Sequence, residues 1–261
     1  MRSLSIAATG MLAQQLNVEV ISNNIANMNT TGFKRRRAEF ADLLYQNIRN
    51  VGADSSSSGT VVPAGVQVGV GVKPTAVYRI AEQGNLVSTD NPLDIAINGH
   101  GYLEVELPDG EIGYTRSGAL QRSFDGTIVT SDGYTVLPGV TIPDNAKTIT
   151  INPNGEVLVT TTGTVTPQNL GQLELAVFAN EGGLEAIGDN LLKETAASGP
   201  AIAGTPGSDG FGTIQQGFLE TSNVNVVAEI TNLITAQRAY EMNSKVIQAS
   251  DDMMAALTQM R

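Results

Sequence analysis

A His–Ser–Asp triad would need the chain's single histidine. His100 stands between Gly99 and Gly101. An imidazole beside a serine and an aspartate could activate a hydroxyl group, but the sequence has no Gly-x-Ser-x-Gly pattern to hold such a serine on a sharp turn. A histidine flanked by glycines is typical of an exposed turn. We therefore expect no catalytic residue at this position.

Metal and cofactor sites are poorly supported as well. The chain has one histidine and no cysteine, so it offers no histidine pair and no thiolate for zinc. Asp251-Asp252 lies in a helical context, where we expect it to face solvent. Gly69-Val70-Gly71 has two glycines of a phosphate-binding loop, but Pro74 stands where the third glycine belongs. From these observations together, we expect neither a metal nor a cofactor. The 26 acidic residues leave two-carboxylate glycoside hydrolysis open, although no spacing singles out a pair.

The charge distribution narrows the choice of partners. The formal net charge is −11, which argues against nucleic-acid binding. Residues 1–50 hold six basic and three acidic side chains, a net of +3, so the remainder carries −14. Opposite charges on parts of identical subunits would favour docking between them, but only weakly at physiological ionic strength.

The N-terminal segment does not look like a targeting sequence. No apolar stretch approaches the length of about 18 residues that a membrane span needs, and no small-residue cleavage site follows Gln14-Gln15. We therefore expect no membrane span and no cleaved signal peptide. This leaves the cytoplasm or export by a signal-less route.

Proline and glycine divide the chain into two helical ends and a turn-rich middle. All ten prolines fall between Pro63 and Pro206, and 26 of the 28 glycines fall between Gly52 and Gly217. Both residues disfavour helix interiors, so their scarcity at the ends favours long helices there. The core must rest on aliphatic residues, because aromatics make up only 5% of the chain and tryptophan is absent.

Each end carries apolar residues that recur every seven positions. The repeat comprises Leu4, Met11, Val18 and Ile25 near the N-terminus, and Val226, Leu233, Tyr240, Ile247 and Met254 near the C-terminus. Such a repeat is typical of a coiled coil. An ordinary amphipathic pair that covers a core is the alternative that spacing alone leaves open. Either Asn223 or Asn225 could cap the start of the C-terminal helix.

An asparagine-rich segment follows the N-terminal helix. Asparagine side chains compete for backbone hydrogen bonds and Gly32 allows a positive φ, so the helix should end within residues 23–34. A basic run from Lys34 to Arg37 comes next. It is either a solvated face or a contact to acidic groups on a neighbouring subunit.

The middle of the chain is expected to be extended and then β-rich. Residues 45–75 form a glycine- and serine-rich linker, in which the alternating valines from Val66 to Val72 fit a strand. Beyond residue 76, short apolar runs alternate with hairpin dipeptides, which predicts an antiparallel sandwich or irregular barrel. The dipeptides are Asn98-Gly99, Asp109-Gly110, Asp125-Gly126, Asp132-Gly133 and Asn154-Gly155.

Several of these segments resemble the flagellar basal-body rod and hook proteins of bacteria. The N-terminal signature residues are Asn23, Asn24, Asn27, Gly32, Phe33 and Lys34. The run from Leu93 to Leu103, the Tyr114-Thr115-Arg116-Ser117-Gly118 turn and Asp132-Gly133-Tyr134 are similar to the core pattern of that family. The linker and the C-terminal segment are most similar to subunits of the distal rod.

The resemblance implies an α+β fold in which long N- and C-terminal helices pair as a coiled coil around an inserted antiparallel β domain. The expected divisions are a helical region at 1–44 that pairs with 222–261, the linker at 45–75 and the β-rich core at 76–221. The nine residues of the apolar repeat would form the self-assembly interface.

The implied function is structural and not enzymatic. The chain would polymerise into a hollow helical shaft in the periplasm that transmits torque to the hook, after export without a cleaved signal. Its partners would be copies of itself and the proximal rod, hook and ring proteins. A proximal rod subunit, a hook subunit, and a secreted β-domain hydrolase or adhesin with a helical stalk remain alternatives.

Overall fold

The chain folds into two compact units, which the computed structural model describes for residues 2–49, 64–162 and 166–259. The helical unit combines Met1–Ile25, Arg36–Tyr78 and Val226–Arg261. The β unit combines Ala26–Arg35 with Arg79–Asn225. Among the described residues, no helix is long and apolar enough to cross a membrane.

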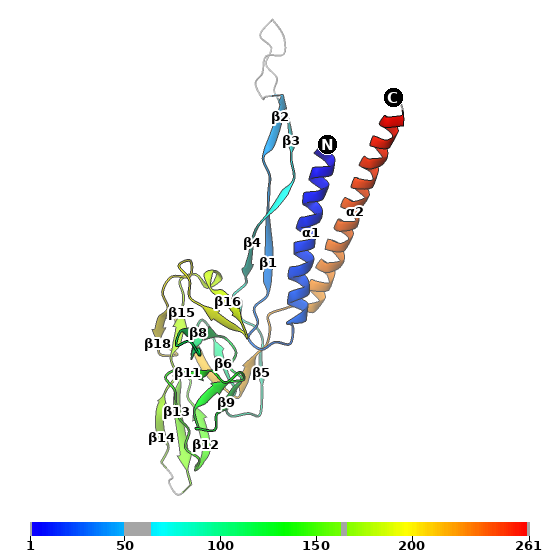
Figure 1. Cartoon of the computed structure of the whole chain (residues 1–261). Helices are drawn as coiled ribbons and strands as arrows, with labels where there is room; N and C mark the ends of the chain where they lie inside the picture. The colour runs from blue at the N-terminus through cyan, green and yellow to red at the C-terminus, as the bar shows by residue number, and fades with distance from the viewer. Residues whose placement is uncertain (1, 50–63, 163–165, 260–261) are drawn as a thin grey trace. The chain divides into compact units, whose positions relative to one another are not determined.

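Two long helices form the terminal parts of the helical unit (Figure 1). Helix α1 runs from Arg2 to Ala26, so it ends within the asparagine-rich segment as the sequence predicts. Helix α2 spans Val226–Gln259 and begins directly after Asn225. The side chain of Asn223, the other expected cap, instead binds the backbone of Arg35, Ile80 and Glu82 in the β unit.

A ribbon of paired strands completes the helical unit. Strand β1 (Arg36–Asp42) pairs with β4 (Val72–Arg79), and β2 (Tyr45–Arg49) pairs antiparallel with β3 (Val66–Gly69). Of the alternating valines, Val66 and Val68 lie in β3 and Val72 begins β4, while Val70 lies between the two strands. The serine-rich part of the expected linker, residues 50–63, lies outside the described residues.

The β unit consists almost entirely of short strands. They are β5 (Leu86–Ser88), β6 (Ile95–Asn98), β7 (Tyr102–Glu106), β8 (Ile112–Thr115), β9 (Leu120–Arg122), β10 (Ile128–Thr130), β11 (Thr135–Val136), β12 (Ala146–Ile151), β13 (Glu156–Thr161), β14 (Gln168–Gln172), β15 (Leu175–Val177), β16 (Glu185–Gly188), β17 (Leu191–Lys193), β18 (Ile202–Gly204), β19 (Thr213–Gln216) and β20 (Phe218–Glu220). A single 3-10 turn, η1 (Glu181–Gly183), interrupts them in the described part of this unit.

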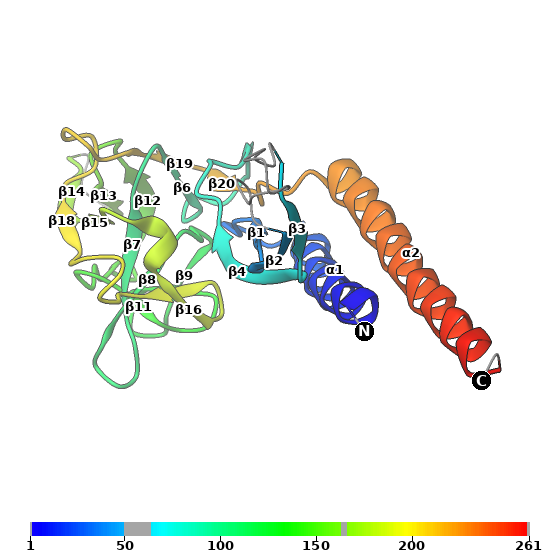
Figure 2. The same cartoon turned by 90° about the horizontal axis from the view of Figure 1, so that it is seen from above.

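The strands of the β unit, seen from above in Figure 2, belong to four sheets with antiparallel pairing. The largest has nine strands in the order β16-β17-β8-β7-β11-β10-β9, with β15 joining β7 and β18 joining β15. A second sheet has the order β12-β13-β14, and β19 pairs with β6 while β20 pairs with β5. Strands that close the unit, β19 and β20, thus pair with strands near its start.

Four of the five predicted hairpin dipeptides join paired strands, and one does not. Asp109-Gly110, Asp125-Gly126, Asp132-Gly133 and Asn154-Gly155 connect antiparallel neighbours. The prediction for Asn98-Gly99 was wrong, because β6 pairs with β19 while β7 pairs with β8, β11 and β15. The turn instead carries the chain between two sheets, and the His100 carbonyl accepts a hydrogen bond from Gly212 N–H at 2.7 Å.

Two apolar clusters fill the β unit. The larger one is aliphatic and includes Ile95, Leu103, Val105, Ile128 and Leu175, each at most 1% exposed. The smaller one is aromatic. Its Phe178 ring meets Tyr114 edge-on at 4.8 Å and Tyr102 at 6.1 Å. The aliphatic core agrees with the low aromatic content of the sequence.

Replacing Leu103 by alanine should destabilise the β unit by about 2–5 kcal/mol, because the side chain is fully buried and its removal leaves a cavity. Ile202→Ala is the matched control, since Ile202 is 58% exposed and should cost less than about 1 kcal/mol. Chemical denaturation of both variants measures the difference. Equal losses would contradict this placement of the core.

Candidate functional site

Helices α1 and α2 touch at three levels and run antiparallel (Figure 1). At one end, Asn24 Nδ2 lies 3.3 Å from Glu229 Oε2, and at the other, the hydroxyls of Ser3 and Ser250 are 3.3 Å apart. Between them, a Cβ added to Gly10 would lie 2.9 Å from the Asn243 amide. Along α1 the contact residues are spaced by multiples of seven, and their partners on α2 are spaced in the same way.

This contact line is made of small and polar residues. The same spacing places Asn17 opposite Ala236, which is only 2% exposed. Gly10 allows close approach, because any side chain there would displace the Asn243 amide. We call the pairs Ser3–Ser250, Gly10–Asn243, Asn17–Ala236 and Asn24–Glu229 the helix seam.

The apolar repeat residues do not make these contacts. On α1 each repeat residue follows a seam residue by one position, and none of the nine repeat residues is buried. Tyr240 is 45% exposed, and the other eight are half-buried. Their assignment as a self-assembly interface therefore stays a prediction.

The side chain of Asn24 links α1, β1 and α2 of the helical unit by hydrogen bonds. Its side-chain amide donates to the Arg36 carbonyl at 2.8 Å and to Glu229 Oε2, while its carbonyl oxygen accepts from Arg36 N–H at 2.8 Å. Asn24 is 1% exposed, so these bonds are shielded from water. This signature asparagine thus ties the end of α1 to the starts of β1 and α2.

Large apolar side chains are exposed mainly on the helical unit. On α2 they are Val227, Ile230, Ile234, Tyr240, Met242, Val246 and Met253, and on the ribbon they are Phe40, Leu44, Tyr45, Ile48, Val66 and Val77. Exposed apolar surface of this extent is typical of protein interfaces. A helix that is apolar on several sides normally lies buried among other helices.

In the β unit, the signature lysine belongs to a buried ionic cluster. Lys34 Nζ lies 2.5 Å from Glu220 Oε1, and Arg116 Nε lies 2.7 Å from Glu220 Oε2. Lys34, Arg116 and Glu220 are 6%, 8% and 1% exposed. Both interpretations of the basic run were therefore wrong for Lys34, because its charge is neutralised inside its own chain.

The cluster joins segments that are far apart in the sequence. Lys34 Nζ also donates to the Glu82 carbonyl at 2.8 Å, and Gly84 N–H donates to Glu220 Oε1 at 2.9 Å. The Arg116 guanidinium donates to the carbonyls of Ile97, Gly99 and Gly101. Three of the family-like motifs thus meet at one place, which their spacing in the sequence could not reveal.

Gly32 shows why the N-terminal signature contains a glycine. Its φ is +70°, and its N–H donates to the Glu220 carbonyl at 2.8 Å. A Cβ there would lie 2.8 Å from the carbonyl carbon of Arg116, closer than real contacts allow. A glycine at this position lets residues 32–34 lie directly on the Arg116 turn.

Opposing effects set the charges of the cluster. Burial lowers the pKa of Lys34, and the nearby Glu220 carboxylate partly offsets this shift. Burial alone would raise the pKa of Glu220, but the Arg116 charge and the hydrogen bonds from Lys34, Arg116 and Gly84 together lower it. Glu220 is therefore held as a carboxylate, which suits it to binding its two cations and not to proton transfer.

His100 lies at the surface of the β unit and pairs with an acid. The His100 side chain is 74% exposed, and its Nδ1 lies 3.2 Å from Glu181, which also accepts the Tyr102 hydroxyl at 2.8 Å. These residues border a cleft of about 430 Å³. Within the described residues no group of histidines and acids could hold a metal. Asp251 and Asp252 are exposed as predicted.

Glu220→Gln should destabilise the β unit by about 3–5 kcal/mol, because it leaves two buried cations without a counter-ion. Lys34→Met should cost less, since Arg116 and Gly84 still bind the carboxylate. Glu82→Gln is the control for an exposed ion pair, with Arg35, and should cost about 0–1 kcal/mol. Urea denaturation gives the order, and a larger loss for Lys34→Met than for Glu220→Gln would contradict it.

Acid should weaken the wild type more steeply than Glu220→Gln. The pKa of Glu220 lies below its ordinary value of 4.5 in the folded chain, so the unfolded chain binds this proton more readily. The contribution of the carboxylate to stability is full above that ordinary value and is lost as the pH falls below it. Denaturation between neutral pH and about pH 3 measures the difference. The same acid dependence in both proteins would count against the cluster.

Three protein-family models match separate segments of the chain. The model of the flagella basal body rod protein matches residues 4–34, the flagellar hook protein FlgE/F/G D1 domain matches residues 96–159, and the flagellar basal body rod FlgEFG protein C-terminal region matches residues 215–260. The first match covers the signature residues and most of α1, and the last covers α2.

Full-length relatives agree with these matches. The chain is 61% identical over 261 residues to the flagellar basal-body rod protein FlgG of Caulobacter vibrioides, with all of both chains covered. It is 51% identical to FlgG of Agrobacterium fabrum, with 99% of this chain and 98% of the relative covered. The flagellar hook-basal body complex protein FlhP of Bacillus subtilis is 33% identical, with both chains covered in full. The chain therefore belongs to the flagellar basal-body rod protein family that includes FlgG.

Proposed function

We propose that this chain is the structural subunit of the distal rod and polymerises with copies of itself into a hollow helical shaft. Two relatives that match over essentially their whole length, at 61% and 51% identity, are named as flagellar basal-body rod proteins. A rod subunit needs surfaces that are exposed in the monomer and buried in the polymer. The apolar side chains of α2 and of the ribbon are exposed in the single chain, which supports this role.

The terminal helices are the proposed tube-forming part. The helix seam holds α1 and α2 of one chain together through small and polar residues. The half-buried apolar repeat beside it would pack against neighbouring helices as in a coiled coil. Contacts between different surfaces of identical subunits generate an open helical filament, as a rod requires. Torque would then be shared among many apolar contacts.

We propose that the ribbon of paired strands packs along an adjacent subunit in the polymer. A two-stranded ribbon on its own is marginally stable in water, and every residue of β2 is exposed. Leu44, 86% exposed, and Ile48, 60% exposed, would become buried along an adjacent subunit. Contacts of this kind would limit bending of the shaft.

The proposed partners are other copies of the chain, proximal rod subunits, hook subunits and the ring proteins around the rod. The proposed location is the periplasmic part of the basal body, reached by export without cleavage of a signal. A proximal rod or hook subunit is the second candidate, because the relative from Bacillus subtilis is named as a hook-basal body complex protein. The names of the full-length relatives give no support to a hydrolase or an adhesin.

Leu233→Asp should block polymerisation and leave the β unit folded. Leu233 belongs to the apolar repeat on α2, so a subunit interface would bury the new carboxylate without a partner, at a cost of several kcal/mol per subunit. Sedimentation measures assembly, and circular dichroism measures folding. Leu233→Met is the control and should assemble. Normal filaments from Leu233→Asp would contradict the role of the repeat.

The position of the subunit can be tested by electron microscopy of basal bodies from a deletion strain. A distal rod subunit predicts a rod that stops below the outer membrane. A complete rod without a hook would instead assign the chain to the hook.

A further inference from the structure

Helix α2 continues beyond the end of its partner. The seam ends at Ser3–Ser250, and the described part of α1 begins at Arg2. Residues 252–259 of α2 therefore extend past the described part of α1 (Figure 1). We call residues 251–259 the α2 tip.

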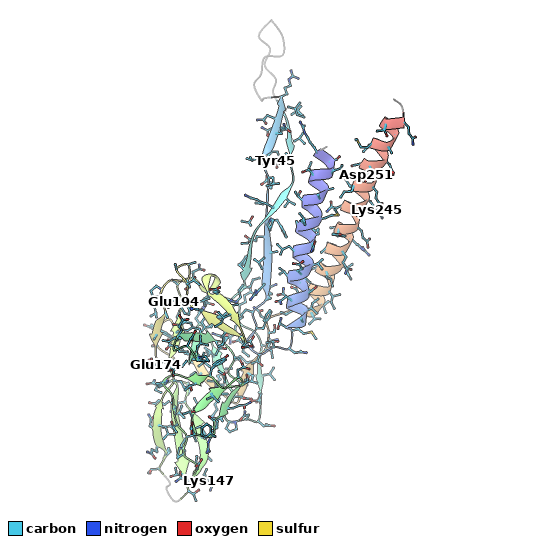
Figure 3. All side chains as sticks on the ribbon, viewed as in Figure 1. Tyr45, Lys147, Glu174, Glu194, Lys245 and Asp251 are labelled. Atoms are coloured by element: carbon cyan, nitrogen blue, oxygen red, sulfur yellow. The ribbon has the colours of Figure 1, made fainter. Side chains whose placement is uncertain are left out.

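The α2 tip combines apolar surface with negative charge. Met253 is 61% exposed. Asp251 and Asp252 are also exposed and are the only charged residues between 246 and 259. Figure 3 marks Asp251 on the final turns of the helix. Arg2 stands at the same end of the unit, but no ion pair joins it to either aspartate within the described chain.

The opposite end of the helical unit carries two arginines beside the buried Glu229. Asn24 holds the backbone of Arg36 at the end of α1, beside the start of α2. The basic run contributes Arg36 and Arg37 there, because Lys34 and Arg35 pair with acids of the β unit. Arg37 is exposed, and neither of these two arginines forms an ion pair among the described residues. Glu39 is the nearest exposed acid along β1.

We propose that the α2 tip of one subunit docks head-to-tail on Arg36 and Arg37 of a second copy of the chain. The partner is a second copy because its surface supplies the complementary charge and because the two surfaces lie at opposite ends of one unit. Contacts between opposite ends repeat without closing, so each docking step adds a subunit. A helix of 34 residues is about 50 Å long, which sets the scale of the axial repeat.

This inference rests on the proposed self-assembly and adds its axial contact. Attraction between the aspartates and the arginines would determine which surfaces dock and in what register. Met253 would contribute apolar area to the same interface. Charged pairs near a surface act at short range and are screened by salt. Assembly should therefore weaken as ionic strength rises.

Complementary charge reversal tests the contact in the full-length protein. Asp251→Lys with Asp252→Lys, and separately Arg36→Glu with Arg37→Glu, should each raise the lowest concentration that gives sedimenting filaments by roughly tenfold at low salt. Mixing the two reversed proteins should restore filaments, because each offers the end that fits the other, and so should combining the four changes in one chain. Asp125→Lys with Asp209→Lys is the control on exposed acids of the β unit and should assemble as the wild type does.

Two results would overturn the contact: reversed proteins that assemble like the wild type, or no restoration by the four-fold change when each protein is folded by circular dichroism. If Arg36→Glu with Arg37→Glu does not fold, Arg36→Gln with Arg37→Gln takes its place, and undiminished assembly of that protein would also overturn the contact. A wild type that forms no filaments at any concentration would refute self-assembly itself, which separates the two failures.

Discussion

The helix seam is the contact on which the proposed assembly depends. It joins the two ends of the chain through small and polar residues, with Gly10 allowing close approach and Asn24 binding Glu229. Because these residues occupy the inner line, larger apolar side chains of α2 remain outside. A subunit built this way can hold its own helices in register and still offer apolar surface to its neighbours. A seam made of leucines would use up that surface within the monomer.

In the β unit, a buried ionic cluster holds together chain segments from the start and the end of the unit. Lys34 enters from the N-terminal side, Glu220 from the C-terminal side, and Arg116 binds the turn at Gly99. A buried ion pair contributes little net stability compared with apolar residues, but it allows few alternative arrangements. Residues of three family-like motifs therefore act together in this one cluster.

Local patterns predicted local structure well. The distribution of proline and glycine predicted the positions of both helices, and four dipeptides predicted hairpins. These predictions succeed because such residues restrict or extend the allowed backbone angles. Features that depend on distant partners were missed. Lys34 looks solvated until Glu220 is known to lie beside it, and Asn98-Gly99 looks like a hairpin until Gly212 is known to pack against it. The apolar repeat marked the helices but not which residues touch.

The most direct test of the account uses the absence of cysteine from the chain. Ser3→Cys with Ser250→Cys should form a disulfide within single chains, in the monomer and in filaments alike, because the two hydroxyls are 3.3 Å apart across the seam. Mass spectrometry after proteolysis identifies the linked peptides, and mixing chains of two isotopic compositions shows whether the link lies within one chain. A link within chains that leaves assembly intact is the predicted result. Links mainly between chains, or a linked monomer that cannot assemble, would contradict the seam as the inner contact of the subunit.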